Sequence, residues 1–170
     1  MTESKKNRLG DILVKQGLVT DEQLAKAVHR QGQTDDRLGS SLVRLGFLEV
    51  GVLARVLGQQ VGVAGCDLFA IRVPGEILAK LTPAQMQKFR VIPVGVHNRK
   101  AQIVTADPTD SEVLEKVAFA LGMSLQVVVV PAYQMTAALA FLKEKGSFPK
   151  DGLSPALWES SVVEPEPSGD

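Results

Sequence analysis

The first 60 residues contain the same 24-residue pattern twice, and this repeat limits the possible folds more than any other feature. The first copy, RLGDILVKQGLVTDEQLAKAVHRQ, spans residues 8–31, and the second, RLGSSLVRLGFLEVGVLARVLGQQ, spans 37–60. Five residues separate the copies, and their alignment needs no insertion. A solenoid of such units needs about three copies to be stable. Two copies alone therefore predict a folded pair with pseudo-two-fold symmetry.

Each copy is predicted to form two short helices, because its apolar residues recur with helical spacing. Gly17 stands where a helix end favours a left-handed residue. Thr20 and Gln23 then have the spacing of a capping box, which begins the next helix. Glu49 replaces Thr20 in the second copy, so we expect a weaker cap there. The sequence thus predicts a four-helix subdomain over residues 8–62.

After the repeats the pattern changes to short strands and helices punctuated by prolines. Residues 91–96 and 101–105 are β-type runs joined by a polar tetrad, which predicts a hairpin. Residues 125–130 are a further strand, and a helix is expected on each side of it. The order strand–strand–helix–strand–helix predicts a small α/β subdomain with a three-stranded sheet over residues 66–145. The predicted fold class is therefore α+β.

The two ends of the chain differ from the rest in composition. Residues 1–7 are a polar lead that we expect to be flexible. Residues 146–170 are rich in Pro, Ser, Gly and Glu, which predicts a disordered tail and favours a natural end to the chain. This tail contains Trp158, the only tryptophan. Disorder is the favoured interpretation for Trp158, and a short docking segment is the alternative.

Charge and cysteine content restrict the compartment and the partners. The net charge is zero, which argues against general binding of a nucleic acid polymer or a membrane surface. The lone Cys66 cannot form an internal disulfide, as fits a reducing cytoplasm. The N-terminus lacks the apolar core of a signal peptide, and no apolar run approaches the roughly 20 residues of a membrane-spanning helix. We expect a cytoplasmic protein without membrane insertion.

Packing explains most of the repeated apolar positions, but it does not explain the arginine that begins each copy. Arg8 and Arg37 directly precede Leu-Gly and a helix start, where backbone N–H groups are free. Gly10 and Gly39 lack the side chain that would keep a ligand away. With the glutamine that ends each copy, these residues suit a flat anionic ligand with stackable rings. The alternative is that both arginines are solvated surface residues.

Two equivalent half-sites suit a ligand with two equivalent halves, such as a cyclic dinucleotide. The repeated pattern Arg-Leu-Gly-x-x-Leu-Val-x-x-Gly resembles the MshEN domain, found at the N-terminus of bacterial type II secretion and type IV pilus assembly ATPases. Members of that family bind the second messenger cyclic di-GMP. The segments VIPV at 91–94 and ADPTD at 106–110 resemble the second half of the same module. The resemblance covers residues 8–145.

The resemblance implies a cyclic di-GMP site with one half from each copy. The first half comprises Arg8, Leu9, Gly10, Leu13, Val14, Leu24, Val28 and Gln31, and the second comprises Arg37, Leu38, Gly39, Leu42, Val43, Leu53, Leu57 and Gln60. Val28 departs from the usual leucine, and the lost methylene weakens binding by about 1 kcal/mol at most. Asp107 is a weaker candidate, because a turn formed by Asp-Pro is the favoured explanation for it.

No catalytic, metal or cofactor site is expected. The phosphate-binding loop GxxxxGK[ST] is absent, and no nucleophile–base pair stands out. His29 and His97, the only histidines, fall in different subdomains. The sequence thus predicts a non-enzymatic cyclic di-GMP receptor module, without the ATPase domain, that signals to a protein partner. The alternative is a ligand-free docking or adaptor module of a secretion, pilus or motility machine.

Overall fold

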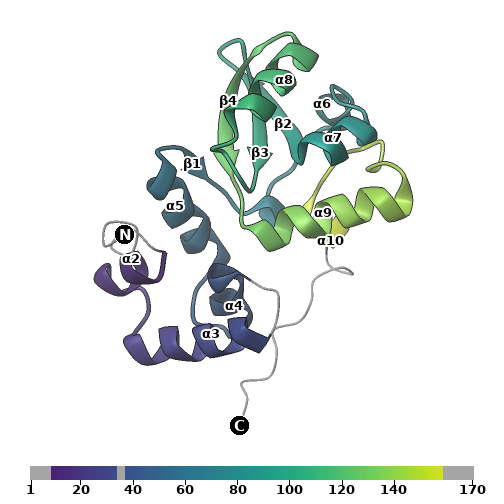
Figure 1. The fold of residues 1–170 in the computed structure, drawn as a ribbon. Coiled ribbons are helices and arrows are strands. Elements are labelled where there is room, and N and C mark those ends of the chain that lie inside the picture. Colours follow the sequence, from purple (N-terminus) through teal and green to yellow (C-terminus); the bar gives the residue numbers. More distant parts are fainter. Residues whose placement is uncertain (1–8, 34–36, 159–170) are drawn as a thin grey trace.

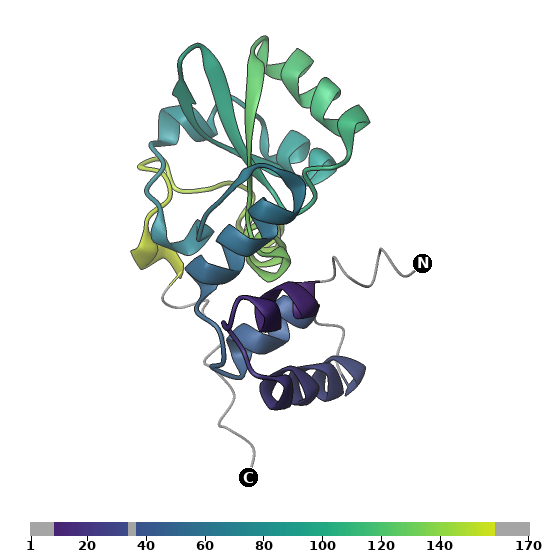
Figure 2. The same ribbon diagram turned by 90° about the vertical axis from the view of Figure 1, so that its left-hand side faces the viewer.

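The computed structural model describes residues 9–33 and 37–158. A helical subdomain comes first and a sheet subdomain second, and helix α5 leads from one to the other (Figures 1 and 2). The fold class α+β is therefore confirmed. In the described ranges, no helix combines the length and the apolar character needed to cross a membrane.

In residues 9–33 and 37–61, four helices form the first subdomain, as predicted. They are α2 (Leu9–Lys15), α3 (Asp21–Gln33), α4 (Leu38–Arg44) and α5 (Val50–Val61). Gly17 and Gly46 follow α2 and α4 with φ values of 74° and 79°. This left-handed conformation favours glycine and stops a helix. Both predicted stops are therefore confirmed.

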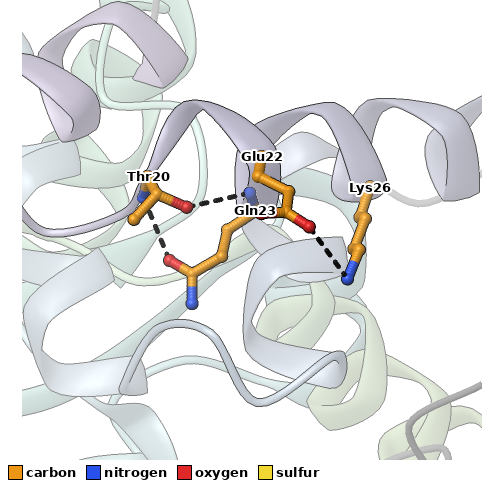
Figure 3. Close-up of polar contacts among 4 residues, drawn as sticks. All are labelled: Thr20, Glu22, Gln23 and Lys26. Atoms are coloured by element: carbon orange, nitrogen blue, oxygen red, sulfur yellow. Dashed lines mark hydrogen bonds and ion pairs between the residues drawn. The ribbon is translucent and has the colours of Figure 1, made fainter.

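The two longer helices begin differently, as their first residues predict. The backbone N–H of Gln23 donates to Thr20 Oγ1 at 3.1 Å, and the N–H of Thr20 donates to Gln23 Oε1 at 3.0 Å (Figure 3). One turn on, Lys26 Nζ lies 3.8 Å from Glu22 Oε1. Glu49, the N-cap of α5, makes no side-chain capping bond. The capping box and the weaker second cap are both confirmed.

The first helices of the two copies pack on each other through their glycines. A Cβ on Gly10 would lie 3.2 Å from Leu38 of the second copy. A Cβ on Gly39 would lie 3.1 Å from Leu9 of the first copy. The contacts are reciprocal, so each glycine receives a leucine from the opposite copy. This close approach brings the two Leu-Gly segments together.

The sheet has four strands, in the order β1-β4-β3-β2. They are β1 (Ala64–Gly65), β2 (Val91–His97), β3 (Lys100–Thr105) and β4 (Ser124–Val129). The prediction of three strands was wrong, because β1 joins in parallel beside β4, pairing Ala64 with Val128. A strand of two residues is too short to show an alternating pattern. The predicted hairpin is confirmed: β2 and β3 are antiparallel, and their turn places Asn98 and Arg99 at φ 50° and 63°.

Short and long helices cover this sheet. They are η1 (Leu68–Ala70), α6 (Gly75–Leu78), α7 (Pro83–Phe89), α8 (Ser111–Leu121), α9 (Ala132–Lys145) and α10 (Pro155–Trp158). Asp110 caps α8 by accepting from the N–H of Val113 at 3.2 Å. Pro131 precedes α9 as predicted. The core of the subdomain lies between the sheet and these helices.

The segment after α9 belongs to the core as far as Trp158, which corrects the prediction of disorder from residue 146. Trp158 is 1% exposed, and its ring stacks on Phe69 with a centroid distance of 4.8 Å. Leu153 and Val73 exchange two backbone hydrogen bonds of 2.9 Å. Three widely spaced apolar residues, Phe148, Leu153 and Trp158, anchor this segment in the core. The segment as a whole is polar in composition, and for that reason the sequence indicated disorder. The rest of the predicted tail, 159–170, and the predicted lead, 1–7, lie outside the described residues.

Helix α5 and strand β1 are in backbone contact where the subdomains join. A Cβ on Gly65 would overlap the carbonyl oxygen of Ala54 in α5. A Cβ on Gly58 would overlap the carbonyl oxygen of Val63, in the turn that follows the helix. No side chain separates helix from strand at these points. Helix α5 therefore packs backbone to backbone against the edge strand of the sheet.

Candidate ligand-binding site between the subdomains

Two adjoining cavities lie beside the start of α4. The smaller has a volume of about 230 Å³. Its wall from the helical subdomain includes Leu9, Leu38, Gly39, Leu53 and Leu57, and its wall from the sheet subdomain consists of Ala106, Val130, Pro131 and Ala132. Arg37, the exposed N-cap residue of α4, also lines this cavity. The cavity is thus an apolar space with an arginine beside it.

The larger cavity has a volume of about 640 Å³ and is more polar. Helix α4 and its N-cap contribute Arg37, Ser40 and Arg44, and the sheet subdomain contributes Lys88, Arg90, Asp107, Asp110 and Tyr133 among others. Both cavities are lined by Arg37, Ser40, Ala106 and Ala132. The two spaces are therefore neighbours.

The structure brings together much of the second predicted half-site. Arg37, Leu38, Gly39, Leu53 and Leu57 all line the smaller cavity, and Leu9 joins them from the first copy. The sheet subdomain closes this space from the other side.

Other predicted residues lie elsewhere. Leu13 and Leu42 are 0% exposed in the core of the helical subdomain, so their position is that of packing residues. Val28 is 51% exposed on α3. Neither cavity is lined by Gly10, Leu13, Val14, Leu24, Val28, Leu42, Val43 or Gln60. Arg8 and the side chain of Gln31 lie outside what the structure describes.

The glycines have a different role from the one expected. The sequence suggests that Gly10 and Gly39 leave room for a ligand. In the structure, leucine side chains occupy that space: a Cβ on Gly10 would lie 3.0 Å from Leu24, and one on Gly39 would lie 2.7 Å from Leu53. Both glycines therefore serve the packing of α2 and α4, and Gly39 also lines the smaller cavity.

Asp107 forms a turn and lines the larger cavity. Its carboxylate accepts the backbone N–H of Thr109 at 3.1 Å and also the Thr109 hydroxyl, so it forms the expected turn. These hydrogen bonds lower the pKa of Asp107, and the positive charge of Arg37 lowers it further. Asp107 thus stays ionised at the wall of the larger cavity, facing the field of Arg37 across the two subdomains.

Arg44 of α4 and Tyr133 of α9 contact each other at the larger cavity, which both residues line. The Arg44 guanidinium carbon lies 6.0 Å from the centroid of the Tyr133 ring, within the range of a cation–π contact. Burial, followed by the negative charge of Asp67, raises the pKa of Tyr133 to about 12. The phenol is therefore neutral at physiological pH.

Sequence reasoning did not find the cationic residues of the larger cavity. Arg44 occupies the same repeat position as Lys15, and this shared basic character was a usable signal. Lys88 and Arg90 lie in no repeat and no motif, so the sequence contains no signal for them. Tertiary folding alone brings them near α4. Throughout residues 9–33 and 37–158, no cluster of three His, Cys, Asp or Glu side chains could hold a metal ion.

Comparisons with known proteins agree with this architecture. Residues 61–145 match the MshEN domain family. The type IV pilus assembly ATPase PilB of Myxococcus xanthus is 30% identical over 141 residues, 82% of this chain and 25% of that protein. PilB of Thermus thermophilus is 27% identical over 165 residues, 96% of this chain and 17% of that protein. The chain therefore spans a quarter or less of these relatives.

A solved structure of MshE with cdg is similar in fold. The TM-score is 0.55 and the identity 30%, over 78% of this chain and 96% of that one. The family match at 61–145 comprises the last residue of α5 and the sheet subdomain through α9. The MshE alignment covers more of the chain than that segment, so it extends into the helical repeats or the C-terminal segment.

Proposed function

Because the chain belongs to the MshEN domain family, we propose that it is a receptor module for cyclic di-GMP. It binds the dinucleotide in the space between the helical and the sheet subdomains and passes the binding event to a protein partner. On this proposal the chain is a binding module and catalyses no reaction.

The smaller cavity carries the proposal. Leu9, Leu38, Leu53 and Leu57 form an apolar bed, and Arg37 stands at its edge. A guanine base presents a flat apolar face, on which a guanidinium also stacks, and the phosphates attract the arginine charge. The residue types suit a ligand that is aromatic and anionic at once, as cyclic di-GMP is.

The matched MshE structure supports this ligand, because it holds cdg, which is cyclic di-GMP. The PilB relatives are type IV pilus assembly ATPases. By analogy we place the partner in a pilus or secretion assembly.

The cavity position suggests how binding produces a signal. Leu53 and Leu57 lie on α5, whereas Val130 and Pro131 belong to the sheet subdomain, and the ligand contacts both groups. A ligand shifts a conformational equilibrium only through contacts that differ between the states. Contacts with two subdomains at once meet this condition, and the backbone contact of α5 with β1 carries the change to the sheet.

Isothermal titration calorimetry tests the proposal with a matched pair of variants. Arg37→Ala removes the arginine that lines both cavities, and Arg55→Ala removes an exposed arginine of α5 that lines neither. We expect wild type and Arg55→Ala to bind cyclic di-GMP alike, in preference to GTP, ATP and cyclic di-AMP. Arg37→Ala should bind at least tenfold more weakly. Absence of cyclic di-GMP binding in the wild type would reject the receptor and leave the ligand-free docking module.

A further inference from the structure

We propose that the acidic segment at residues 159–170 of this chain docks in the larger cavity, through the cations that the sheet subdomain contributes. The docking itself is independent of the function proposed above. Its consequence rests on that function, because a docked carboxylate competes with cyclic di-GMP for Arg37, which lines both cavities. The segment is then an autoinhibitor of the receptor.

The charge of the larger cavity gives the first reason. In a chain of zero net charge, its lining includes four cationic residues: Arg37, Arg44, Lys88 and Arg90. The two acidic residues of the lining, Asp107 and Asp110, are engaged in a turn and a helix cap. Lys88 and Arg90 are exposed, belong to neither predicted half-site and form no ion pair with any residue in 9–33 or 37–158. These two cations therefore remain available for an anionic occupant.

The acidic segment has the complementary charge and sufficient length. It contains no lysine or arginine and four acidic residues: Glu159, Glu164, Glu166 and Asp170. Its twelve residues span up to roughly 40 Å when extended. A segment with these properties can bring its carboxylates to the cations of a cavity that lies near its start.

The acidic segment does start near the larger cavity. Trp158, the residue directly before it, stacks on Phe69 with a centroid distance of 4.8 Å. The Phe69 ring contacts the edge of Tyr133 at a centroid distance of 6.2 Å, and Tyr133 lines the larger cavity. Two ring contacts thus connect the last described residue with the cavity wall, and the twelve residues that follow exceed this distance severalfold.

The indole of Trp158 indicates that the residues after it pack on the domain. Trp158 is 1% exposed, and within the described residues its Nε1–H group has no hydrogen-bond partner. A buried donor without an acceptor is costly, so nearly all such groups in proteins have a partner. The carboxylate of Glu159 and the backbone carbonyl groups after it can provide the acceptor.

The backbone of Arg90 gives a further reason for a role of charge in this cavity. Arg90 is the C-cap of α7, with φ 54° and ψ 46°. This left-handed position favours glycine, which the helix stops at Gly17, Gly46 and Gly122 contain. Residues held in such a conformation concentrate at functional sites. A positive charge at the cavity wall accounts for an arginine in place of a glycine.

The test compares two full-length variants that lose the same number of charges. Glu164→Gln with Glu166→Gln removes two carboxylates of the acidic segment. Glu49→Gln with Glu76→Gln removes two exposed carboxylates that line neither cavity. Amide chemical shifts are recorded by NMR without any added ligand, first at low salt and then at about 1 M salt, where the Debye length is about 3 Å.

We expect the first variant to differ from the wild type at the amides of Lys88, Arg90 and Tyr133, and the second variant to leave these amides unchanged. The difference should disappear at high salt, because screening releases the acidic segment in the wild type as well. Unchanged shifts at these amides in the first variant, or equal changes in both variants, would overturn the docking.

Calorimetry with cyclic di-GMP tests the consequence. A docked segment leaves only a fraction of the molecules competent to bind, so the Glu164→Gln/Glu166→Gln variant should bind the ligand severalfold more tightly than the wild type. The Glu49→Gln/Glu76→Gln variant should bind as the wild type does. Equal affinities in all three proteins would overturn the autoinhibition and leave the receptor standing. If the wild type binds no cyclic di-GMP, the proposed function fails, and the NMR comparison still decides whether the segment docks.

Discussion

Helix α5 contains two glycines with different surroundings, and they provide a matched test of the junction between the subdomains. A Cβ on Gly58 would overlap the carbonyl oxygen of Val63 and lie 3.0 Å from backbone atoms of Ala64 and Gly65. A Cβ on Gly51, in the same helix, would meet nothing within 4 Å. Substitution by alanine therefore adds the same atom to crowded space in one case and to open space in the other.

The two substitutions should change the free energy of unfolding in opposite directions. Alanine is favoured over glycine within a helix by roughly 0.5–1 kcal/mol, so Gly51→Ala should stabilise the protein by up to this amount. Gly58→Ala has the same helical gain, but its overlap involves backbone that cannot rotate away. Overpacking costs about 1–3 kcal/mol, which gives a net loss of about 1–2 kcal/mol. For a chain of this size, the melting temperatures should differ between the variants by about 5 °C.

Urea unfolding followed by far-ultraviolet circular dichroism measures both free energies of unfolding. Fluorescence of the single Trp158 reports the sheet subdomain separately, because the indole is buried in its core. If Gly58→Ala is as stable as Gly51→Ala, α5 and β1 do not pack as described, and direct transmission from helix to sheet is refuted.

Three further predictions concern other parts of the chain. Trp158→Ala should lower the free energy of unfolding by about 3–5 kcal/mol, because the indole is buried. Phe119→Ala, at a residue 90% exposed, should change it by less than about 0.5 kcal/mol. Equal effects of the two substitutions in urea unfolding would show that the C-terminal segment is not part of the core. Thr20→Ala should cost about 1 kcal/mol through the lost cap, and Glu49→Ala, which loses no capping bond, should be nearly neutral in the same assay. Burial, and then the charge of Asp67, raises the pKa of Cys66 to about 11, so alkylation of Cys66 near pH 8 should be at least about 100-fold slower than that of a free cysteine. Because the thiol holds its proton more tightly in the folded state, the free energy of unfolding should fall as the pH rises from about 9 to 11. Alkylation as fast as that of a free cysteine would contradict a buried thiol.

Features encoded by neighbouring residues could be predicted from the sequence. Thr20 and Gln23 form a capping box because three residues separate them in any helix that begins there. Gly17 ends its helix for an equally local reason. The hairpin around Asn98 and the N-cap at Asp110 belong to the same class.

Features that depend on distant contacts could not be predicted. Strand β1 exists because Ala64 and Gly65 meet β4, more than 60 residues later. Trp158 is ordered because Phe69 and Phe141 provide a surface for it, whereas the composition around it indicates disorder. The pattern of neighbouring residues in the sequence contains no information about either contact.

The candidate site was predictable only on one side. The repeated motif identifies Arg37, Leu38 and Leu57, because the same residue types recur at a fixed spacing. Lys88 and Tyr133 come from single positions in other elements, and the fold alone places them opposite α4. The motif also includes Leu13 and Leu42, since helical spacing does not distinguish a ligand wall from a packed core.

The central claim is that cyclic di-GMP binds between the two subdomains, and amide chemical-shift mapping by NMR tests it most directly. On titration of the ¹⁵N-labelled protein, we expect the largest shifts at Leu38, Gly39 and Leu57 on the helical side and at Ala106 and Ala132 on the sheet side. The amides around Phe119, near the C-terminal end of α8, should not move, because this end of the helix lines neither cavity. Shifts confined to one subdomain, or no shifts at saturating ligand, would contradict the account.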